Sequence, residues 1–257
     1  MSGHSKWSTI KRKKGEKDNA RAKVFTKISR EILVCVKETG SADPAVNNKL
    51  RDLVTKARAN NIPNDNIDRL LKKAAGGTEK NDYEVCVYEG YGAGGIAVMA
   101  ACLTDNRNRT AGEIRHYFDK YGGNMGATGC VSFMFAPKGV VVIDNDPDTA
   151  GKSDRIAEDD DDFAEFIIEA GASDYDFSDG IVELYCEPGD VSELGARFSG
   201  GGYRVLSAEV QQLPDLYTTL SDDEQIKKVS LLLDALDDND DVQNVWHNLG
   251  NVDGDAE

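Results

Sequence analysis

The sequence predicts an α+β protein with a helical N-terminal region followed by two small α/β sandwich domains. Apolar residues recur at helical spacing through about residue 75, and from Asn81 the period changes to strand-like alternation. Beyond that point, short strands alternate with helices, a pattern typical of helices packed on one face of an antiparallel sheet. With 257 residues and 40% hydrophobic composition, the chain is long enough for two or three cores.

Three amphipathic helices are expected within the first 80 residues. The first spans about residues 24–36, the second opens at Asp43-Pro44 with Asp43 as its N-cap, and the third begins at Pro63 and closes at Gly76-Gly77. Short loops between such helices favour a small antiparallel bundle. The second and third helices could form a helix-turn-helix, but no basic residues mark the N-terminal end of a reading helix.

Two strands are expected at residues 83–89 and 96–104, joined by a glycine-rich segment. Gly90–Gly95 formally matches the dinucleotide-binding pattern G-x-G-x-x-G. That fingerprint needs a helix directly after the glycines, because the N-terminus of the helix holds the pyrophosphate. Residues 96–100 instead have the composition of a strand, so we predict a hairpin connection and not a nucleotide site.

A helix over about residues 110–121 is predicted from a capping box, Thr110–Glu113, and the glycines that follow. Arg107 and Arg109 stand immediately before this cap, where the helix macrodipole disfavours exposed cations by up to ~1 kcal/mol each. Two guanidinium groups beside a helix N-terminus suit a phosphate. The alternative is that Asp105 pairs with an arginine and the loop is purely structural.

The remaining chain alternates between strands and helices. Strands are expected at about residues 130–135, 139–143, 174–177, 180–186, 203–210 and 241–247, with helices after Asp162, after Pro188 and after a second capping box, Ser221–Glu224. The acidic stretch 144–162 has aspartates at calcium-loop spacing. It carries Thr149 where the motif needs Gly and Arg155 where it needs Glu, so an EF-hand is rejected and the role of the stretch stays open.

No metal site, cofactor, disulfide or catalytic centre is expected. The five cysteines are odd in number, widely spaced and set among apolar neighbours, which is typical of reduced core residues in a cytosolic protein. The three histidines do not cluster. No apolar run approaches the length of a membrane span, and the basic N-terminus lacks the apolar region of a secretory signal. We therefore expect a cytoplasmic protein without a membrane partner.

The charge of the chain is strongly polarised. Residues 1–80 hold 19 basic and 9 acidic residues, a net of +10, whereas the whole chain has a net charge of -16. The remaining residues therefore carry 11 basic and 37 acidic side chains, a net of -26. The basic residues 1–80 (the head) precede an acidic remainder, residues 81–257 (the body). This division points to a polyanionic partner for the head, and nucleic acid is the obvious one.

The basic residues are densest in the first thirty residues. Residues 1–17 contain few large apolar side chains and cannot form a core of their own, so we expect an arm that becomes ordered on a nucleic acid, with Trp7 stacking on a base. The alternative is that the cations only solvate a helix face. The candidate nucleic-acid-binding residues are Lys6, Trp7, Lys11, Arg12, Lys13, Lys14, Lys17, Arg21, Lys23, Lys27 and Arg30.

Several motifs closely resemble the YebC family, which includes bacterial proteins described as probable transcriptional regulators and a mitochondrial translational activator of cytochrome oxidase. The matching motifs run from Met1 to about Val140, and a looser likeness continues to about Trp246. They are Met1–Trp7 (MSGHSKW), Lys11–Lys14 (KRKK), Asp18–Arg21 (DNAR), Lys23–Phe25 (KVF), Tyr88–Gly92 (YEGYG), Leu103–Thr110 (LTDNRNRT) and Gly122–Gly126 (GGNMG).

The resemblance implies three domains, one of them inserted in another. We place a basic arm and helical nucleic-acid-binding domain at 1–80, a central α/β domain at 81–134 plus 209–248, an inserted acidic α/β domain at 135–208, and a disordered tail at 249–257. The resemblance also implies nucleic-acid binding without catalytic activity. The residues alone had left a tandem and an inserted arrangement open.

Three functions remain to be compared. The leading hypothesis is a ribosome-associated translation factor whose head binds ribosomal RNA or tRNA, since RNA suits an arm that reads shape. The second is a transcriptional regulator on duplex DNA, in which contact is confined to the head because the acidic body is repelled by phosphates. The third, an enzyme acting on a phosphorylated small molecule at Arg107 and Arg109, lacks an accompanying acid–base pair, nucleophile or metal cluster. The oligomeric state is not predicted.

Overall fold

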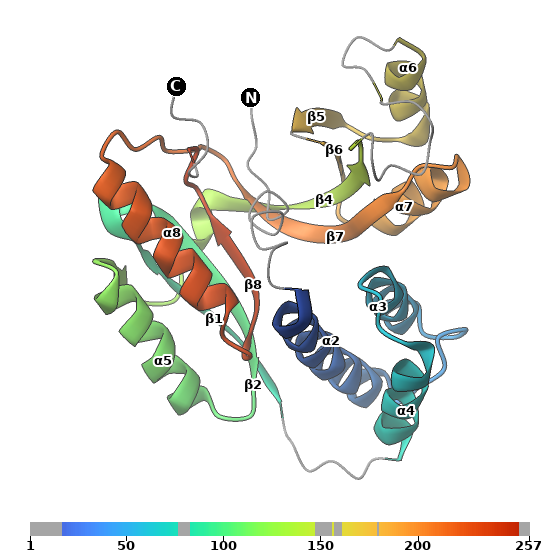
Figure 1. Cartoon of the computed structure of the whole chain (residues 1–257), viewed down its shortest axis with the longest axis horizontal. Helices are drawn as coiled ribbons and strands as arrows, with labels where there is room; N and C mark the ends of the chain where they lie inside the picture. Colours follow the sequence, from blue (N-terminus) through green and yellow to red (C-terminus); the bar gives the residue numbers. More distant parts are fainter. Residues whose placement is uncertain (1–16, 77–82, 147–155, 157–160, 179, 252–257) are drawn as a thin grey trace. The chain divides into compact units, whose positions relative to one another are not determined.

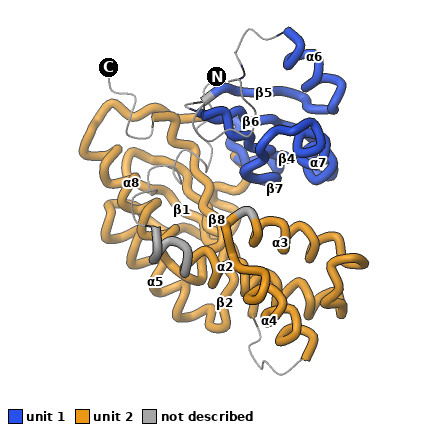
Figure 2. The backbone as a smooth tube through the Cα atoms, turned by 45° about the vertical axis from the view of Figure 1, so that its right-hand side comes forward, with its two compact units in different colours: residues 1–7, 135–215 blue, residues 8–134, 216–257 orange. Residues whose placement is uncertain are grey.

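The structure is a computed structural model that describes the chain apart from residues 1–16, 77–82, 147–155, 157–160, 179 and 252–257 (Figure 1). The described part contains seven α-helices and two four-stranded sheets, which confirms the α+β class. It divides into two compact units (Figure 2). The larger unit holds the described residues of Ser8–Met134 and Leu216–Glu257, and the smaller unit holds those of Phe135–Asp215.

The expected three-helix bundle forms the first part of the larger unit. It consists of α2 (Lys17–Thr39), α3 (Asn48–Ala59) and α4 (Asn64–Ala75). Its core is aliphatic, because each helix turns one apolar stripe inward. The fully buried side chains of this core include Ile28, Ile32, Leu50, Val54 and Ile67.

The start of the second helix differs from the expectation. Asp43 does not cap α3; its carboxylate accepts a hydrogen bond from the Ala45 amide (2.9 Å) in a turn that precedes the helix. The N-cap is Asn47, whose Oδ1 accepts from the Leu50 amide at 3.1 Å. The buried Asn47 side chain also donates to Thr39 Oγ1 at 2.8 Å, so the amide satisfies groups on two helices that a carboxylate could not.

The first sheet has the order β3-β1-β2-β8 and is antiparallel throughout. Its strands are β1 (Glu84–Tyr91), β2 (Ala97–Thr104), β3 (Asn124–Met125) and β8 (Val242–His247). Alternate residues of β2 face a core formed with α5 (Arg107–Lys120) and α8 (Asp223–Asp237). This core contains Val98, Ala100, Ile114, Phe118 and Leu232.

The glycine-rich segment is a hairpin connection, as expected. β1 and β2 pair from Glu84↔Thr104 to Tyr91↔Ala97, and a single 3-10 turn, Ala93–Gly95, joins them. Gly94 and Gly95 have φ values of 68° and 77°, a backbone region that glycine enters without steric cost. No helix follows the glycines, so the context that a dinucleotide site needs is missing here.

The smaller unit is built on the second sheet, which has the order β5-β6-β4-β7 and is also antiparallel. Its strands are β4 (Phe135–Asp144), β5 (Asp174–Ser178), β6 (Ile181–Cys186) and β7 (Val205–Pro214), and its helices are α6 (Asp161–Ala170) and α7 (Val191–Gly200). The rings of Phe163, Phe166, Phe198 and Tyr203 pack together in its core at centroid separations of 4.9–6.2 Å.

Three further expectations are corrected. The two strands expected between residues 130 and 143 are one strand, β4, preceded by the short turn Ser132–Met134. The strand expected to end at residue 210 continues to Pro214, so the chain returns to the larger unit only at Leu216. Leu249, expected in a disordered tail, is fully buried, and Asn251 exchanges two hydrogen bonds with the Leu220 backbone.

The cysteines form no disulfide. Cys35, Cys86, Cys102 and Cys186 are buried, in agreement with the expected core role, and Cys130 is half-buried. The three-domain division, with the bundle as a domain separate from the first sheet, stays a proposal.

Candidate nucleic-acid interface

Most of the expected nucleic-acid-binding residues lie in or before the first turns of α2. Lys6, Trp7, Lys11, Arg12, Lys13 and Lys14 fall outside the described residues. Lys17 and Arg21 lie in the first two turns of α2. Lys23, Lys27 and Arg30 follow at i, i+4 and i+7, which places them on one face of the helix.

This cationic face of α2 is occupied by carboxylates from the other end of the chain. Lys23 Nζ lies 3.0 Å from Asp238 Oδ1, and Lys27 Nζ lies 3.2 Å from Asp237 Oδ1. Lys27 also donates to the backbone carbonyl of Asp237 at 2.7 Å. One turn further, Arg30 Nη1 lies 2.7 Å from Asp241 Oδ1.

The partners form one acidic segment, residues 237–241, between the last turn of α8 and the start of β8. Acidic side chains at a helix C-terminus are disfavoured by the macrodipole, and the last turn of α8 contains no basic residue. The cations of α2 compensate both the carboxylates and the open carbonyls of that helix end. Sequence reasoning missed this segment, although a run of aspartates at the C-terminus of a helix was a signal that a cation lies nearby.

Asp241 is the centre of the arrangement. Its side chain is 6% exposed, and four groups contact its two oxygens. Arg30 binds Oδ1, while Arg109 Nη2 and Thr110 Oγ1 both lie 2.7 Å from Oδ2 and Thr104 Oγ1 lies 3.1 Å from it. A single carboxylate thereby joins α2, the end of β2, the first turn of α5 and the start of β8.

The electrostatics of Asp241 follow from these contacts. Burial alone would raise the pKa of Asp241, but hydrogen bonds from Arg109, Thr110, Arg30 and Thr104 together lower it. The pKa of Arg109 is raised, first by its hydrogen bond with Asp241 and then by that with Asp105. The Asp241 carboxylate and the Arg109 guanidinium are therefore both charged at neutral pH.

The arginines beside α5 sit differently from the expectation. The helix begins at Arg107 with Asn106 as its N-cap, whose Oδ1 accepts from the Arg109 amide at 3.1 Å, so the Thr110–Glu113 capping box is wrong. Arg109 lies 2.9 Å from Asp105 Oδ1, the pairing that the sequence left open as the structural alternative. The anion that offsets its position at the helix end is a carboxylate of the chain itself.

Arg107 occupies a more open position. It is 64% exposed and lies 3.8 Å from Glu84, a long contact between two exposed groups that contributes little. Arg107 and Arg109 therefore do not share an anion in this structure. A phosphate contact at Arg107 stays a proposal.

A second buried carboxylate, Glu89 on β1, holds the loop that precedes β4. Glu89 is 3% exposed and accepts backbone hydrogen bonds from Gly129 (2.8 Å), Val131 (2.9 Å) and Ser132 (2.8 Å). Burial alone would raise the pKa of Glu89, but these amides lower it. The alternation of β1 gave no indication of this role, because a lone Glu in a strand is usually exposed.

We expect Glu89→Gln to lower the free energy of unfolding by ~2 kcal/mol. The substitution replaces one acceptor oxygen by an NH₂ group facing a backbone donor, which leaves a buried donor without a partner. Urea titration followed by Trp246 fluorescence would measure the loss. Glu84→Gln, at an exposed position of the same strand, is the matched control and should change stability by less than ~0.5 kcal/mol.

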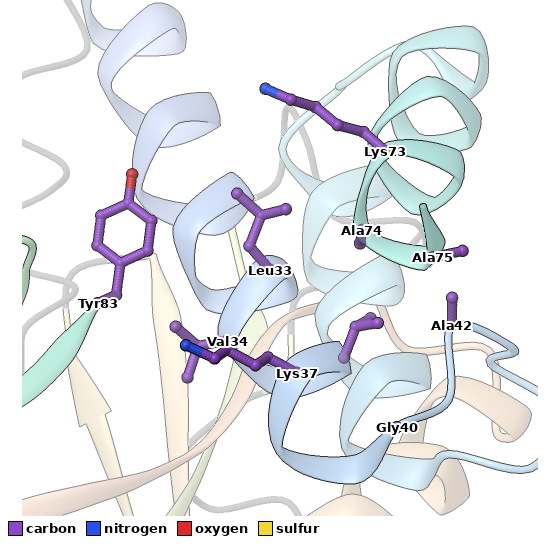
Figure 3. A pocket seen from close by; sticks show the side chains of 10 residues that line it. Leu33, Val34, Lys37, Gly40, Ala42, Lys73, Ala74, Ala75 and Tyr83 are labelled. Carbon is purple, nitrogen blue, oxygen red and sulfur yellow. The ribbon is translucent and has the colours of Figure 1, made fainter. Parts of the chain in front are cut away.

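A cavity of about 370 Å³ opens beside the bundle, lined by α2, the turn after it, α4 and Tyr83 (Figure 3). Its size falls within the range of small-molecule sites. The described residues that line it include no carboxylate, histidine or cysteine. They are Leu33, Val34, Val36, Lys37, Gly40, Ala42, Lys73, Ala74, Ala75 and Tyr83.

Two further features are absent from the described part of the chain. In this part of the chain, no three or more His, Cys, Asp or Glu side chains are arranged to hold a metal ion. Likewise, none of the described helices combines the length and apolar character needed to cross a membrane.

Comparison with known proteins assigns the chain to a family. The family described as "TACO1/YebC protein N-terminal domain" matches residues 5–77, and that described as "TACO1/YebC second and third domain" matches residues 83–249. The chain belongs to the TACO1/YebC family. The Asp241 cluster therefore joins the two matched regions, because Arg30 lies in the first and Arg109 and Asp241 in the second.

Individual relatives span nearly the whole chain. A protein of Acetivibrio thermocellus named "Probable transcriptional regulatory protein" is 49% identical over 248 residues, covering 96% of this chain and 98% of the relative. One of Finegoldia magna with the same name is 45% identical, covering 98% and 100%. The crystal structure of a conserved hypothetical protein, Aq1575, from Aquifex aeolicus matches with a TM-score of 0.83 and 38% identity, covering 95% and 96% of the two chains.

Proposed function

We propose that this TACO1/YebC family member is a nucleic-acid-binding regulator of gene expression that acts as a ribosome-associated translation factor in the cytoplasm. The observation that carries the proposal is the separation of charge along the chain. The first 80 residues have a net charge of +10 and the remainder a net of -26. The basic N-terminal region binds ribosomal RNA or tRNA, and the acidic remainder stays away from the phosphates.

The exposed cations of the bundle extend this basic surface. Besides the residues before and within α2, exposed basic side chains lie on α3 and α4, and those of α4 are concentrated in its second half. This distribution supports contact with phosphates over reading of bases, since recognition helices place their base contacts near the N-terminal end. The residues are Lys49, Arg51, Arg58, Arg69, Lys72 and Lys73.

RNA is favoured over duplex DNA for two reasons. A net of -26 beyond residue 80 would be repelled by a long duplex, which presents phosphates along its whole length. A basic arm with one Trp is suited to the irregular and unpaired segments of folded RNA, where bases are open to stacking.

The second candidate is a DNA-binding transcriptional regulator. The name "Probable transcriptional regulatory protein" of the relatives from Acetivibrio thermocellus and Finegoldia magna favours it. In that case the contact with DNA is confined to the N-terminal region. No catalytic activity is proposed, because the arginines at α5 lack an accompanying acid–base pair among the described residues.

Sedimentation of cell extract through sucrose tests the leading proposal. We expect the protein to travel with ribosomes at low salt and to leave them at high salt, because phosphate contacts weaken as counterions are added. A chain in which Arg51, Arg69 and Lys72 are replaced by Gln is expected to leave at lower salt than the wild type. A protein that stays at the top of the low-salt gradient contradicts the translation role.

A competition experiment with the same protein distinguishes the transcriptional regulator from the translation factor. Competition between a promoter duplex and bulk ribosomal RNA, at one fixed salt concentration, compares the two partners directly. Preference for RNA supports the translation factor. Preference for one duplex sequence over both RNA and unrelated duplex would establish the transcriptional regulator in its place.

A further inference from the structure

The cationic face of α2 makes three ion pairs, and they differ in how far the paired side chains are exposed to solvent. The Lys23–Asp238 pair is open to solvent, with side chains 41% and 58% exposed, and the Lys27–Asp237 pair is partly open, with side chains 14% and 34% exposed. The Arg30–Asp241 pair is almost enclosed, at 17% and 6%. The exposure of the carboxylates therefore falls from Asp238 through Asp237 to Asp241, whereas among the three cations only Lys23 is substantially exposed.

The looser pairs are the ones that solvent and other anions can reach. Exposed ion pairs contribute little to stability and are screened by salt, so their partners exchange readily. The lysine ammonium is a point charge that accepts a phosphate oxygen as well as a carboxylate oxygen. Lys23 can thus change partner without unfolding α2. Lys27 is 14% exposed and also donates to the Asp237 carbonyl, so it has to leave both contacts to reach a phosphate, while Arg30 keeps the helix attached to Asp241.

We propose that Asp237 and Asp238 are an autoinhibitory segment that competes with nucleic-acid phosphates for Lys23 and Lys27. This inference rests on the proposed function, because it concerns the regulation of the same basic surface. In the unbound protein the two carboxylates neutralise the lysines, and the binding of RNA replaces each carboxylate with a phosphate. The position of the segment at the C-terminus of α8 strengthens the competition, since the helix end adds its own negative potential.

The competition has a specific consequence for selectivity. A short or isolated phosphate cannot displace two carboxylates that are held beside the lysines by the fold. A strand that already contacts the residues before α2 brings further phosphates to Lys23 and Lys27 at high effective concentration. The segment therefore discriminates in favour of extended RNA over single anions.

The test uses the full chain and a fluorescein-labelled single-stranded oligouridine of about 20 nucleotides, with fluorescence anisotropy between about 50 and 200 mM KCl. We expect the double variant Asp237→Asn/Asp238→Asn to bind the probe ~3–10-fold more tightly than the wild type at the lowest salt. Asp238→Asn alone, at the more exposed pair, should show about half the gain in the logarithm of affinity.

The matched control is Asp223→Asn/Glu224→Gln. It also removes two negative charges from α8, but at the N-terminal end of the helix, which the rise of an α-helix places about 20 Å from residues 237–238. It reduces the net negative charge by the same amount and also releases Lys228 from Glu224 (2.7 Å), so it shows what net charge and a freed lysine elsewhere on α8 contribute, and it is expected to change affinity less than twofold. Addition of Lys23→Ala and Lys27→Ala to the Asp237→Asn/Asp238→Asn chain should abolish the gain. Thermal unfolding followed by circular dichroism confirms that each variant is folded.

The outcomes separate the inference from the function on which it rests. The proposed autoinhibition is wrong, and RNA binding stands, if the wild type binds the probe and the double variant gains no more affinity than the control. The same holds if the double variant keeps its gain in affinity after Lys23 and Lys27 are replaced. If only the double variant binds, inhibition in the wild type is complete and the inference is supported. If no form binds, both the inference and RNA binding fall.

Discussion

Asp241→Ala is expected to lower the free energy of unfolding of the larger unit by ~3–5 kcal/mol. The substitution leaves two guanidinium groups without the carboxylate that both contact, and it leaves the hydroxyls of Thr104 and Thr110 without their shared acceptor. Removal of one partner from a buried ionic network costs far more than the network contributes over apolar packing, because Arg30 loses the carboxylate that it contacts and Arg109 keeps only the exposed Asp105. The loss should therefore exceed that of any exposed ion pair in the protein.

Tryptophan fluorescence isolates the relevant part of the chain. The protein has two tryptophans, so in a Trp7→Phe background the signal comes from Trp246 in β8 alone. Urea unfolding of this form follows the first sheet. Asp105→Asn removes the other, exposed carboxylate of Arg109 and should cost less than ~1 kcal/mol. Equal losses for the two variants would show that Asp241 has no special role.

The dependence on pH provides a second measure of the same carboxylate. Because the pKa of Asp241 is lowered in the folded state, its stabilising contribution is complete above the unfolded value of ~3.9 and is lost as pH falls through the folded value. The difference in unfolding free energy between the wild type and Asp241→Asn should be constant from about pH 7 to pH 5 and shrink below about pH 4. A difference that stays constant down to pH 2 would contradict this assignment.

Deletion of residues 1–17 is expected to abolish most nucleic-acid affinity while leaving the fold unchanged. The deletion removes six basic residues, and for single-stranded RNA each lost phosphate contact should flatten the log–log salt dependence by ~0.7, to a total of up to ~4. Affinity at low salt should fall by at least ~100-fold. Urea unfolding monitored at Trp246 should be unaltered.

Two comparisons sharpen this result. A chain in which the same six residues, Lys6, Lys11, Arg12, Lys13, Lys14 and Lys17, are replaced by Gln separates charge from chain length, and it should lose almost as much affinity as the deletion. Removal of residues 252–257 at the acidic C-terminus should have no comparable effect. Undiminished RNA binding by the shortened chain would refute a role for the arm.

The sequence predicted well what depends on neighbouring residues. Helical spacing across Ile28 and Ile32, and alternation through β1 and β2, are local signals, and both the bundle and the hairpin followed from them. The start of α3 was predicted wrongly at Asp43, because its side chain satisfies the N-cap pattern as well as that of Asn47, the cap in the structure. The choice between them depends on Thr39, a residue of the preceding helix that only the folded chain brings close.

The site was harder to predict because its charges come from opposite ends of the chain. About 210 residues separate Lys27 from Asp237 and Arg30 from Asp241, so no window of sequence contains both partners. The count of basic residues marked the first thirty residues as cationic, but it could not reveal that Lys23, Lys27 and Arg30 meet carboxylates of their own chain. The same applies to Glu89, whose backbone partners lie some forty residues further on.

The pairing of β4 with β7 has a consequence for how this chain can change. Phe135 and Pro214 are direct neighbours in the second sheet, so the strand that opens the smaller unit and the strand that closes it begin and end side by side. The two ends of the segment 135–214 thus lie next to each other. If the segment were excised, a linker of a few Gly and Ser residues would be long enough to join residue 134 to residue 215. Such a module can be lost, exchanged or reshaped with little disturbance to the host sheet, which gives the protein a region where new properties can be acquired independently.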